Sequence, residues 1–145
     1  MTIPGISFYS ALLISSEIGD VNRFPDSFHL VSFAGLAPST RSSGGKTFHG
    51  RITKTGSSYL RWALNQCTRV SVRTEPDGKL AKFYNRLRAK KGDGKAITAV
   101  SANMLKIVYW VLKERREYYS YGCDCVTVYE DSKPRFFKGR SPLAR

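Results

Sequence analysis

The run "SGGK", Ser43 to Lys46, has the greatest potential for chemistry in this sequence. Its two glycines lack a Cβ atom, so a bulky phosphate backbone can approach the neighbouring hydroxyl closely. Arg51 and Lys54 follow within a few residues and can offer positive charge to the transition state of an attack on a phosphodiester. The residue types therefore outline a phosphoryl-transfer site with Ser43 as the nucleophile.

A serine hydroxyl needs activation before it can attack. His49 is the only imidazole nearby in the sequence, and no acid is visibly paired with it to complete a hydrolase triad. The alternative is a glycine-rich loop that grips phosphate, in which Ser43 only donates a hydrogen bond. "GGKT" also resembles the end of a Walker loop, but that motif needs a glycine where Thr40 stands. On residue types alone, the nucleophile and the phosphate-gripping loop both stay open.

Positive charge is the strongest feature of the composition. The chain carries 24 Lys and Arg against 11 Asp and Glu, a formal net charge of +13. Of these basic residues only Arg23 lies before residue 41, so the excess falls on the remainder of the chain. A dense cationic field favours a polyanion, because each neutralised phosphate releases counterions. Nucleic-acid binding is indicated, and composition does not choose between DNA and RNA.

Other classes of protein are disfavoured by the sequence. No apolar run approaches the roughly 20 residues that span a bilayer, and the N-terminus lacks the features of a signal peptide. The odd set of Cys67, Cys123 and Cys125 fits a reducing compartment. His29 and His49 stand alone, without the ligand spacing of a zinc site. We expect a soluble, cytoplasmic protein with no metal site and no membrane partner.

Two short helices are predicted near the N-terminus. Ser7 can cap the first and Gly19 can end it, while Asp26 or Ser27 can cap the second. With the preceding "PGI" turn, residues 4–36 look like a helix-hairpin-helix, whose hairpin amides can bind a phosphate. An ordinary packed helix pair is the alternative. The first helix would supply its apolar faces from Ala11, Leu12, Ile14 and Ile18.

Residues 38–57 are rich in glycine, proline and polar side chains and predict a long, functional loop, with a short strand or hairpin near "KTFHGRITK". Three amphipathic helices follow: one capped by Ser57 or Ser58, one around Leu80 to Leu87, and one over roughly 96–118. The first of these would bury Leu60, Leu64, Cys67 and Val70. Its opposite stripe, at steps of four, would consist of Arg61, Asn65, Arg69 and Arg73. The second would carry Lys82, Arg86 and Lys90 along one side.

These elements predict a mainly α fold. We expect one small helical domain over residues 1–121, made of the helix-hairpin-helix-like pair, the long Ser/Gly/basic loop and the three amphipathic helices. Residues 122–145 show no sustained period and are expected to form an extended or mobile tail. Nucleic acid would be contacted by the loop and the first amphipathic helix, through Gly44, Gly45, Lys46, Arg51, Lys54, Arg61, Arg69 and Arg73.

Several motifs occur together in a specific order and spacing. They are "EIGD" with Phe24, "AGLAP", "SGGK", then Gly50, Ile52, Lys54 and Gly56, and "LR" with Leu64. In this combination the chain resembles the C-terminal domain of transposases of the insertion-sequence-110 family, over roughly residues 3–121. The resemblance implies DNA recombination by transposition.

The resemblance also implies a catalyst in two parts. In the family, an N-terminal RuvC-like domain holds Mg²⁺ with DEDD carboxylates, and the C-terminal domain supplies a serine that bonds to DNA phosphate. By motif, that serine is Ser43. Family members can also be guided by a structured RNA. The implied partners are therefore DNA, a guide RNA and the RuvC-like domain, and we expect a homo-oligomer in the active complex.

One departure from the family pattern matters: no carboxylate tetrad precedes "PGI". The chain is therefore expected to be an excised or truncated C-terminal domain that is inactive alone, with Mg²⁺ entering through the missing domain. Glu17, Asp20 and Asp26 are expected to be capping or solvated carboxylates. The leading function is the DNA-binding, serine-bearing domain of a transposase or recombinase. A non-catalytic helix-hairpin-helix module and a ribosome-associated structural protein are the alternatives.

Overall fold

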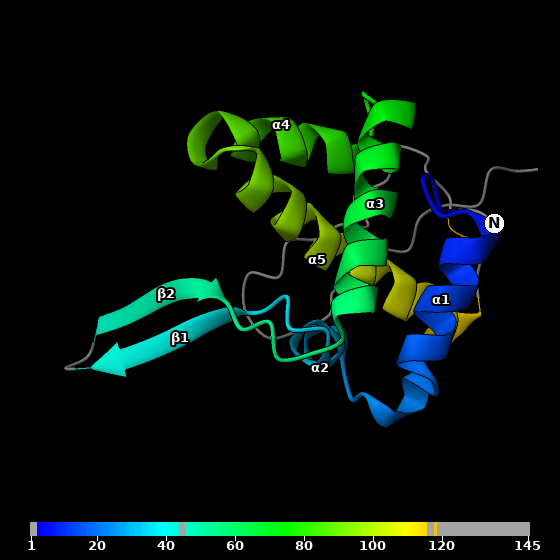
Figure 1. Cartoon of the computed structure of the whole chain (residues 1–145), viewed down its shortest axis with the longest axis horizontal. Coiled ribbons are helices and arrows are strands. Elements are labelled where there is room, and N and C mark those ends of the chain that lie inside the picture. The colour runs from blue at the N-terminus through cyan, green and yellow to red at the C-terminus, as the bar shows by residue number, and fades with distance from the viewer. Residues whose placement is uncertain (1–2, 44–45, 116–117, 119–145) are drawn as a thin grey trace, which may run out of the picture.

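The computed structural model describes residues 3–43, 46–115 and 118, and for residues 41–43 and 46–49 it describes the backbone alone (Figure 1). The predicted mainly α fold is confirmed. The elements are α1 (Phe8–Ile18), the 3-10 helix η1 (Val21–Arg23), α2 (Ser27–Phe33), β1 (Pro38–Ser43), β2 (Lys46–Ile52), α3 (Ser58–Thr74), α4 (Lys79–Lys91) and α5 (Asp93–Glu114). Within the described ranges, no helix combines the length and apolarity that crossing a membrane requires. The expected tail, residues 122–145, lies outside the described residues.

The helices begin where short polar side chains can bond to their first amides. Ser7 caps α1, Asp26 caps α2 and Ser57 caps α3, each accepting a hydrogen bond from the backbone N–H three residues on. Asp20 caps η1 in the same manner through the amide of Asn22. Gly19, with φ of 63°, ends α1. The capping and stop signals predicted from the sequence are confirmed.

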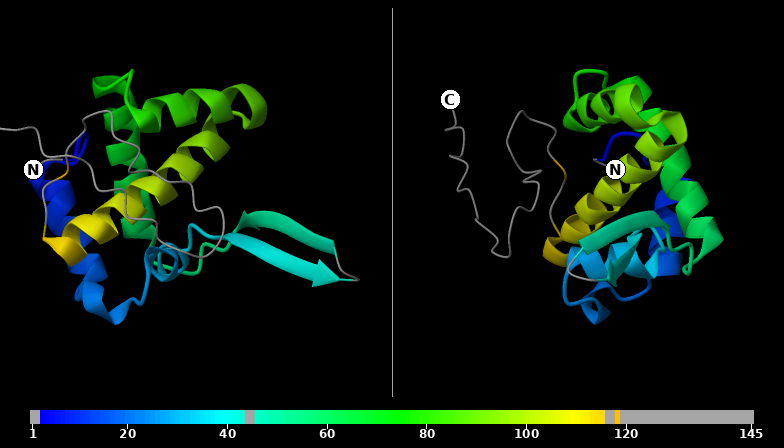
Figure 2. Two further views of the ribbon diagram at one scale, coloured as in Figure 1. Left: turned by 180° about the vertical axis from the view of Figure 1, so that it is seen from behind. Right: turned by 90° about the vertical axis from the view of Figure 1, so that its left-hand side faces the viewer.

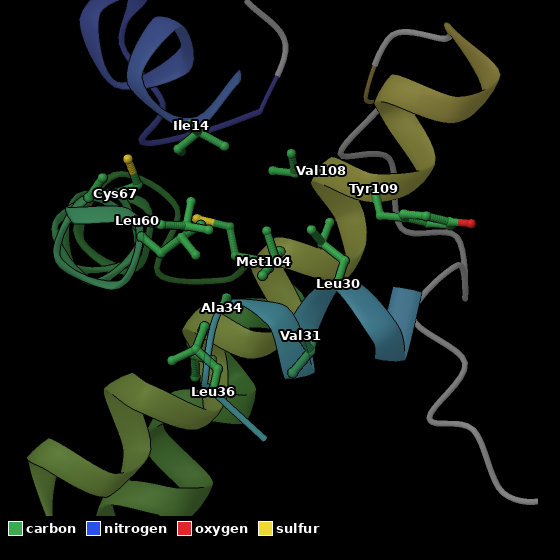
Figure 3. Close-up of a cluster of buried hydrophobic side chains, with 14 of the residues drawn as sticks. Ile14, Leu30, Val31, Ala34, Leu36, Leu60, Cys67, Met104, Val108 and Tyr109 are labelled. Carbon is green, nitrogen blue, oxygen red and sulfur yellow. The ribbon is translucent and has the colours of Figure 1, made fainter. Parts of the chain in front are cut away.

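The core is assembled around α5, which packs against α2, α3, α4 and η1, while α1 packs against α3. Leu30 of α2, Leu60 of α3 and Met104 of α5 are wholly buried at this junction (Figure 3). Burial of each such side chain contributes about 1.5–3 kcal/mol relative to exposure. The helical body is therefore held together chiefly by apolar packing onto one long helix.

A small polar cluster lies inside this apolar interface. The hydroxyls of Thr68 and Ser101 are 3.0 Å apart, and Ser101 donates to Oδ1 of Asn65 at 2.8 Å. Thr68 and Ser101 are fully buried, so each hydroxyl needs such a partner. Asn65 is consequently half-buried against α5, and the predicted placement of Asn65 in the exposed cationic stripe is wrong.

Two other predicted core positions are exposed, and the helix boundaries differ locally. Val70 is 49% exposed and Leu12 is 60% exposed. On α3 the inward position is taken by Ser71, because the chain around Gly5 packs directly on this side of the helix.

The predicted third amphipathic helix begins three residues earlier than expected, at Asp93, and much of the predicted loop forms the two strands.

Gly5 packs against α3 so closely that no larger residue fits. Its φ is +83°, and a Cβ atom there would lie 2.3 Å from the carbonyl oxygen of Cys67 and 2.6 Å from the amide of Ser71. The "PGI" segment therefore has a packing role between the N-terminus and α3. Its predicted phosphate-binding role in a helix-hairpin-helix stays a prediction.

Gly5→Ala should destabilise the fold far more than Gly92→Ala. Gly92 has almost the same φ, +82°, but a Cβ atom there would meet nothing within 4 Å. Both variants carry the backbone strain of about 1–2 kcal/mol, whereas only Gly5→Ala adds an overpacking cost of about 1–3 kcal/mol. Urea unfolding of both variants measures the difference. Equal losses would show that the segment does not pack on α3.

Candidate nucleic-acid interface

The candidate serine lies at the end of a β-hairpin that projects from the helical body (Figures 1 and 2). The strands are antiparallel, with Ser43 paired to Lys46, Ser42 to Thr47 and Thr40 to His49, and an irregularity lies between Pro38 and Thr40. Ser43 is therefore the last residue of β1 and lies opposite the first residue of β2. Gly44 and Gly45, between them in the sequence, lie outside the described residues.

The base of this hairpin continues into the helical body through backbone hydrogen bonds. The amide of Thr53 donates to the carbonyl of Ala37 at 3.0 Å, and the amide of Lys54 donates to the carbonyl of Gly35 at 3.1 Å. A two-stranded ribbon alone is marginally stable in water. The segments 34–37 and 53–56, here called the hairpin base, therefore determine where the projecting strands lie.

Arg61 locks the two segments of the hairpin base together. Its Nη1 donates to the carbonyl of Ala34 at 3.1 Å and also to the carbonyl of Gly56. The approach is close: a Cβ atom on Gly56 would lie 1.9 Å from the carbonyl oxygen of Phe33. We call this arrangement the Arg61 clamp. Sequence reasoning assigned Arg61 to DNA and missed the clamp, because the Ala34 carbonyl lies 27 residues away in the sequence.

Two predicted phosphate-contact residues lie in or next to the hairpin base. Arg51 in β2 and Lys54 after it are both exposed. Lys54 has φ of 56°, a left-handed conformation that costs a residue with a Cβ about 1–2 kcal/mol. The hydrogen bond from its amide to Gly35 holds it there. An exposed lysine is thus fixed in a strained backbone at the root of the hairpin.

Arg69 lies further along α3, at the point where three helices meet. Its Nη2 is 3.2 Å from Oδ2 of Asp93 at the start of α5, and the same carboxylate accepts a hydrogen bond from the hydroxyl of Tyr84 in α4. The Tyr84 hydrogen bond and the charge of Arg69 hold the pKa of Asp93 below its ordinary value. The hydrogen bond to Asp93 also raises the pKa of Tyr84. Sequence reasoning did not single out Asp93, and no motif marked it.

The predicted contact residues fall into separate groups. Ser43 and Lys46 lie at the far end of the hairpin, and Arg51 and Lys54 lie toward its base. On α3, Arg61 to Arg73 spans about 18 Å at 1.5 Å per residue, with Arg61 half-buried in the clamp and Arg69 and Arg73 exposed. The predicted contact of Arg61 with DNA stays a prediction, since its Nη1 already has protein partners.

Metal donors do not gather in the part of the chain that the structure describes. No group of three His, Cys, Asp or Glu side chains there could hold an ion. Carboxylates are instead used locally, as Asp20 and Asp26 are in caps. The described residues therefore do not fit a Mg²⁺ site of their own, and the resemblance assigns that ion to the RuvC-like domain.

Comparison with known proteins gives consistent matches. Residues 1–85 match the family described as Transposase IS116/IS110/IS902 family. The chain is 32% identical over 123 residues to the transposase for insertion sequence element IS1111A of Coxiella burnetii, which covers 83% of this chain and 34% of the relative. It is 33% identical over 114 residues to the transposase for IS1328 of Yersinia enterocolitica, covering 77% of this chain and 34% of the relative.

A third relative carries a different name. The pilin gene-inverting protein of Moraxella bovis is 34% identical over 121 residues, which covers 81% of this chain and 37% of that protein. The chain thus spans about a third of the length of these curated relatives. The family match covers more than half of the chain and includes the hairpin, its base and α3. On this evidence the chain belongs to the IS116/IS110/IS902 family of transposases.

Proposed function

We propose that this chain is the DNA-binding part of a transposase and that Ser43 is its nucleophile toward a DNA phosphate. The observation that carries the proposal is the hairpin register, in which the "SGGK" serine ends β1 opposite Lys46 on a ribbon that projects from the body (Figure 2). Family membership and the name of the pilin gene-inverting relative support recombination of DNA as the process.

The proposed reaction is an exchange of phosphodiester bonds. The Ser43 hydroxyl loses its proton to a base and forms a bond to phosphorus, while the bond from phosphorus to one bridging oxygen of the DNA strand breaks. The freed strand end takes up a proton. The product is a phosphoserine diester, which conserves the bond for later rejoining. Lys46, Arg51 and Lys54 would stabilise the extra negative charge in the transition state.

Other parts of the machinery are proposed to lie beyond this chain. Since the chain spans about a third of its curated relatives, we propose that the remaining length supplies a RuvC-like domain that binds Mg²⁺. A structured guide RNA and a homo-oligomeric active complex belong to the same proposal. The chain alone is expected to bind DNA without cutting it, in the bacterial cytoplasm.

Binding should occur mainly through phosphates and should therefore depend steeply on salt. With six to ten phosphate contacts, affinity for duplex DNA should drop by about 10³- to 10⁵-fold between 50 and 200 mM salt. Fluorescence anisotropy with a labelled duplex measures the slope for this chain. Binding that ignores salt, or no binding at 50 mM, would contradict the proposal that this chain is the DNA-binding part.

The two ends of the α3 arginine series should respond differently to truncation. Arg61→Ala should lower stability by about 1–3 kcal/mol, because it leaves two backbone carbonyls of the hairpin base without their donor. Arg73→Ala, at an exposed position in the last turn, should weaken DNA binding and change stability by less than about 0.5 kcal/mol. Thermal unfolding and anisotropy separate the two effects. The assignment is wrong if Arg61→Ala leaves stability unchanged.

The nucleophile is tested in a full-length transposase that contains this chain. With Mg²⁺, substrate DNA and any required guide RNA, it should form a DNA adduct that survives denaturant, and mass spectrometry should place the DNA on Ser43. Ser43→Ala should abolish the adduct. Ser42→Ala is the matched control, since Ser42 pairs with Thr47 one step further from the hairpin end, and it should retain the adduct.

An adduct on Ser42, Ser39 or a tyrosine would contradict the assignment. A Ser43→Ala protein that binds DNA more weakly and still forms the adduct would favour the alternative, in which Ser43 only donates a hydrogen bond to phosphate.

A further inference from the structure

Helix α4 has an unusual charge composition. Six of its 13 residues are basic and none is acidic. Leu80, Ala81 and Tyr84 are buried, and α4 packs on α5 and α3 through this side. Three of the basic residues recur at steps of four and are all exposed, which places them on the side away from the core. We call Lys82, Arg86 and Lys90 the α4 stripe.

The α4 stripe is unfavourable for an isolated helix. Like charges at i and i+4 repel, and both Lys82 with Arg86 and Arg86 with Lys90 stand in that relation. Gly78 provides no side-chain cap, and the first turn contains no acidic residue. An anion bound along this surface would remove the repulsion.

Neighbouring elements do not neutralise the stripe. Among the residues that the structure describes, no carboxylate forms an ion pair with Lys82, Arg86 or Lys90. Asp93, the first residue of α5, is already hydrogen-bonded to Tyr84 and Arg69. Arg86 lies over the Phe83 ring at 5.3 Å, which fixes its stem without cancelling its charge. The surface therefore presents three positive charges to a partner.

The position of α4 relative to the hairpin suggests which partner this is. Figure 1 and the left panel of Figure 2 show α4 and the hairpin on the same side of the body, with α4 at the upper end of that side and the hairpin at the lower end. Both are tied to α3, the hairpin through Arg61 and α4 through the Arg69, Asp93 and Tyr84 contacts. A ligand bound to the hairpin therefore lies on the same side of the body as α4.

We propose that the α4 stripe contacts the phosphate backbone of the same DNA duplex that the hairpin meets, and this rests on the proposed function. From Lys82 to Lys90 the helix rises about 12 Å. One strand of B-DNA presents a charge about every 3.4 Å of axis, so three or four phosphates face this length. Successive cations of the stripe are about 6 Å apart along the helix, so its three charges are spread over that group of phosphates. Such contacts position the duplex without reading its sequence.

The test replaces Lys82, Arg86 and Lys90 together by Gln in the complete 145-residue chain. Three lost contacts should reduce the magnitude of the slope of log K against log salt by about 2.7. Affinity for duplex DNA at 100 mM salt should fall by at least about tenfold. The thermal midpoint should stay equal or rise, because two like-charge pairs disappear. A variant that merely misfolds would lower it.

A single-charge comparison controls for net charge. Lys82→Gln and Asn22→Asp each lower the net charge by one unit, and Asn22 is exposed in η1, outside α4. Only Lys82→Gln should lower the slope by about 0.9. Equal effects would mean that net charge alone governs affinity, which overturns the α4 contact.

The remaining outcomes separate this inference from the proposed function. If the unmodified chain binds no DNA at 50 mM salt, the proposed function fails and this inference fails with it. If it binds with a steep slope that the triple variant keeps, the α4 contact alone is wrong. If the triple variant loses binding only to a folded RNA of matched length, α4 is an RNA surface and the DNA assignment is overturned.

Discussion

The Arg61 clamp is the interaction on which the candidate site depends. One guanidinium nitrogen joins the carbonyl of Ala34, just after α2, to that of Gly56, just before α3. Hydrogen bonds from a charged donor stabilise by about 1.5–3 kcal/mol, and this one acts where two chain segments touch without an intervening side chain. It acts together with the backbone hydrogen bonds from Thr53 to Ala37 and from Lys54 to Gly35, because a two-stranded ribbon alone is only marginally stable. The clamp therefore relates the Ser43 end of the hairpin to the helices.

The helices themselves are related through α5. Apolar burial brings α2, α3 and α4 onto this helix, but apolar contacts alone tolerate sliding. The Thr68, Ser101 and Asn65 hydrogen bonds make one α3–α5 register better than its neighbours, since any slip would leave buried hydroxyls unpaired. Tyr109 acts similarly toward α2, because its buried hydroxyl donates to the carbonyls of Phe24 and Pro25 just before it. These polar contacts specify the geometry that burial stabilises.

Some of the basic side chains make contacts within the protein. Arg23 lies between the rings of Phe24 and Phe33, at 4.7 and 4.6 Å from their centroids. Lys106 is over Phe28, and burial lowers its pKa, while Lys113 donates to the hydroxyl of Tyr109. Such cations support packing. Net charge therefore overstates the capacity for phosphate, and the exposed cations of the hairpin base, the end of α3 and α4 are the ones that carry the proposals.

The sequence by itself determined the elements that depend on local chemistry. Caps at Ser7, Asp26 and Ser57, the stop at Gly19 and the mainly α class follow from residue types and their spacing, because the first turn of a helix is satisfied by its immediate neighbours. The motifs around Ser43 likewise indicated the transposase family that the comparisons show. The buried face of α3 was also largely predicted, since Leu60, Leu64 and Cys67 are buried. Only the tertiary structure decided the edges of that face and what each cation does. Asn65 turned inward because Ser101 lies opposite it, Val70 was left exposed where Gly5 packs beside Ser71, and Arg61 became a clamp because two distant carbonyls meet there. Ser101 is 36 residues from Asn65, Gly5 is 66 residues from Ser71 and Ala34 is 27 residues from Arg61. The periodicity of a single helix carries no information about partners at such separations.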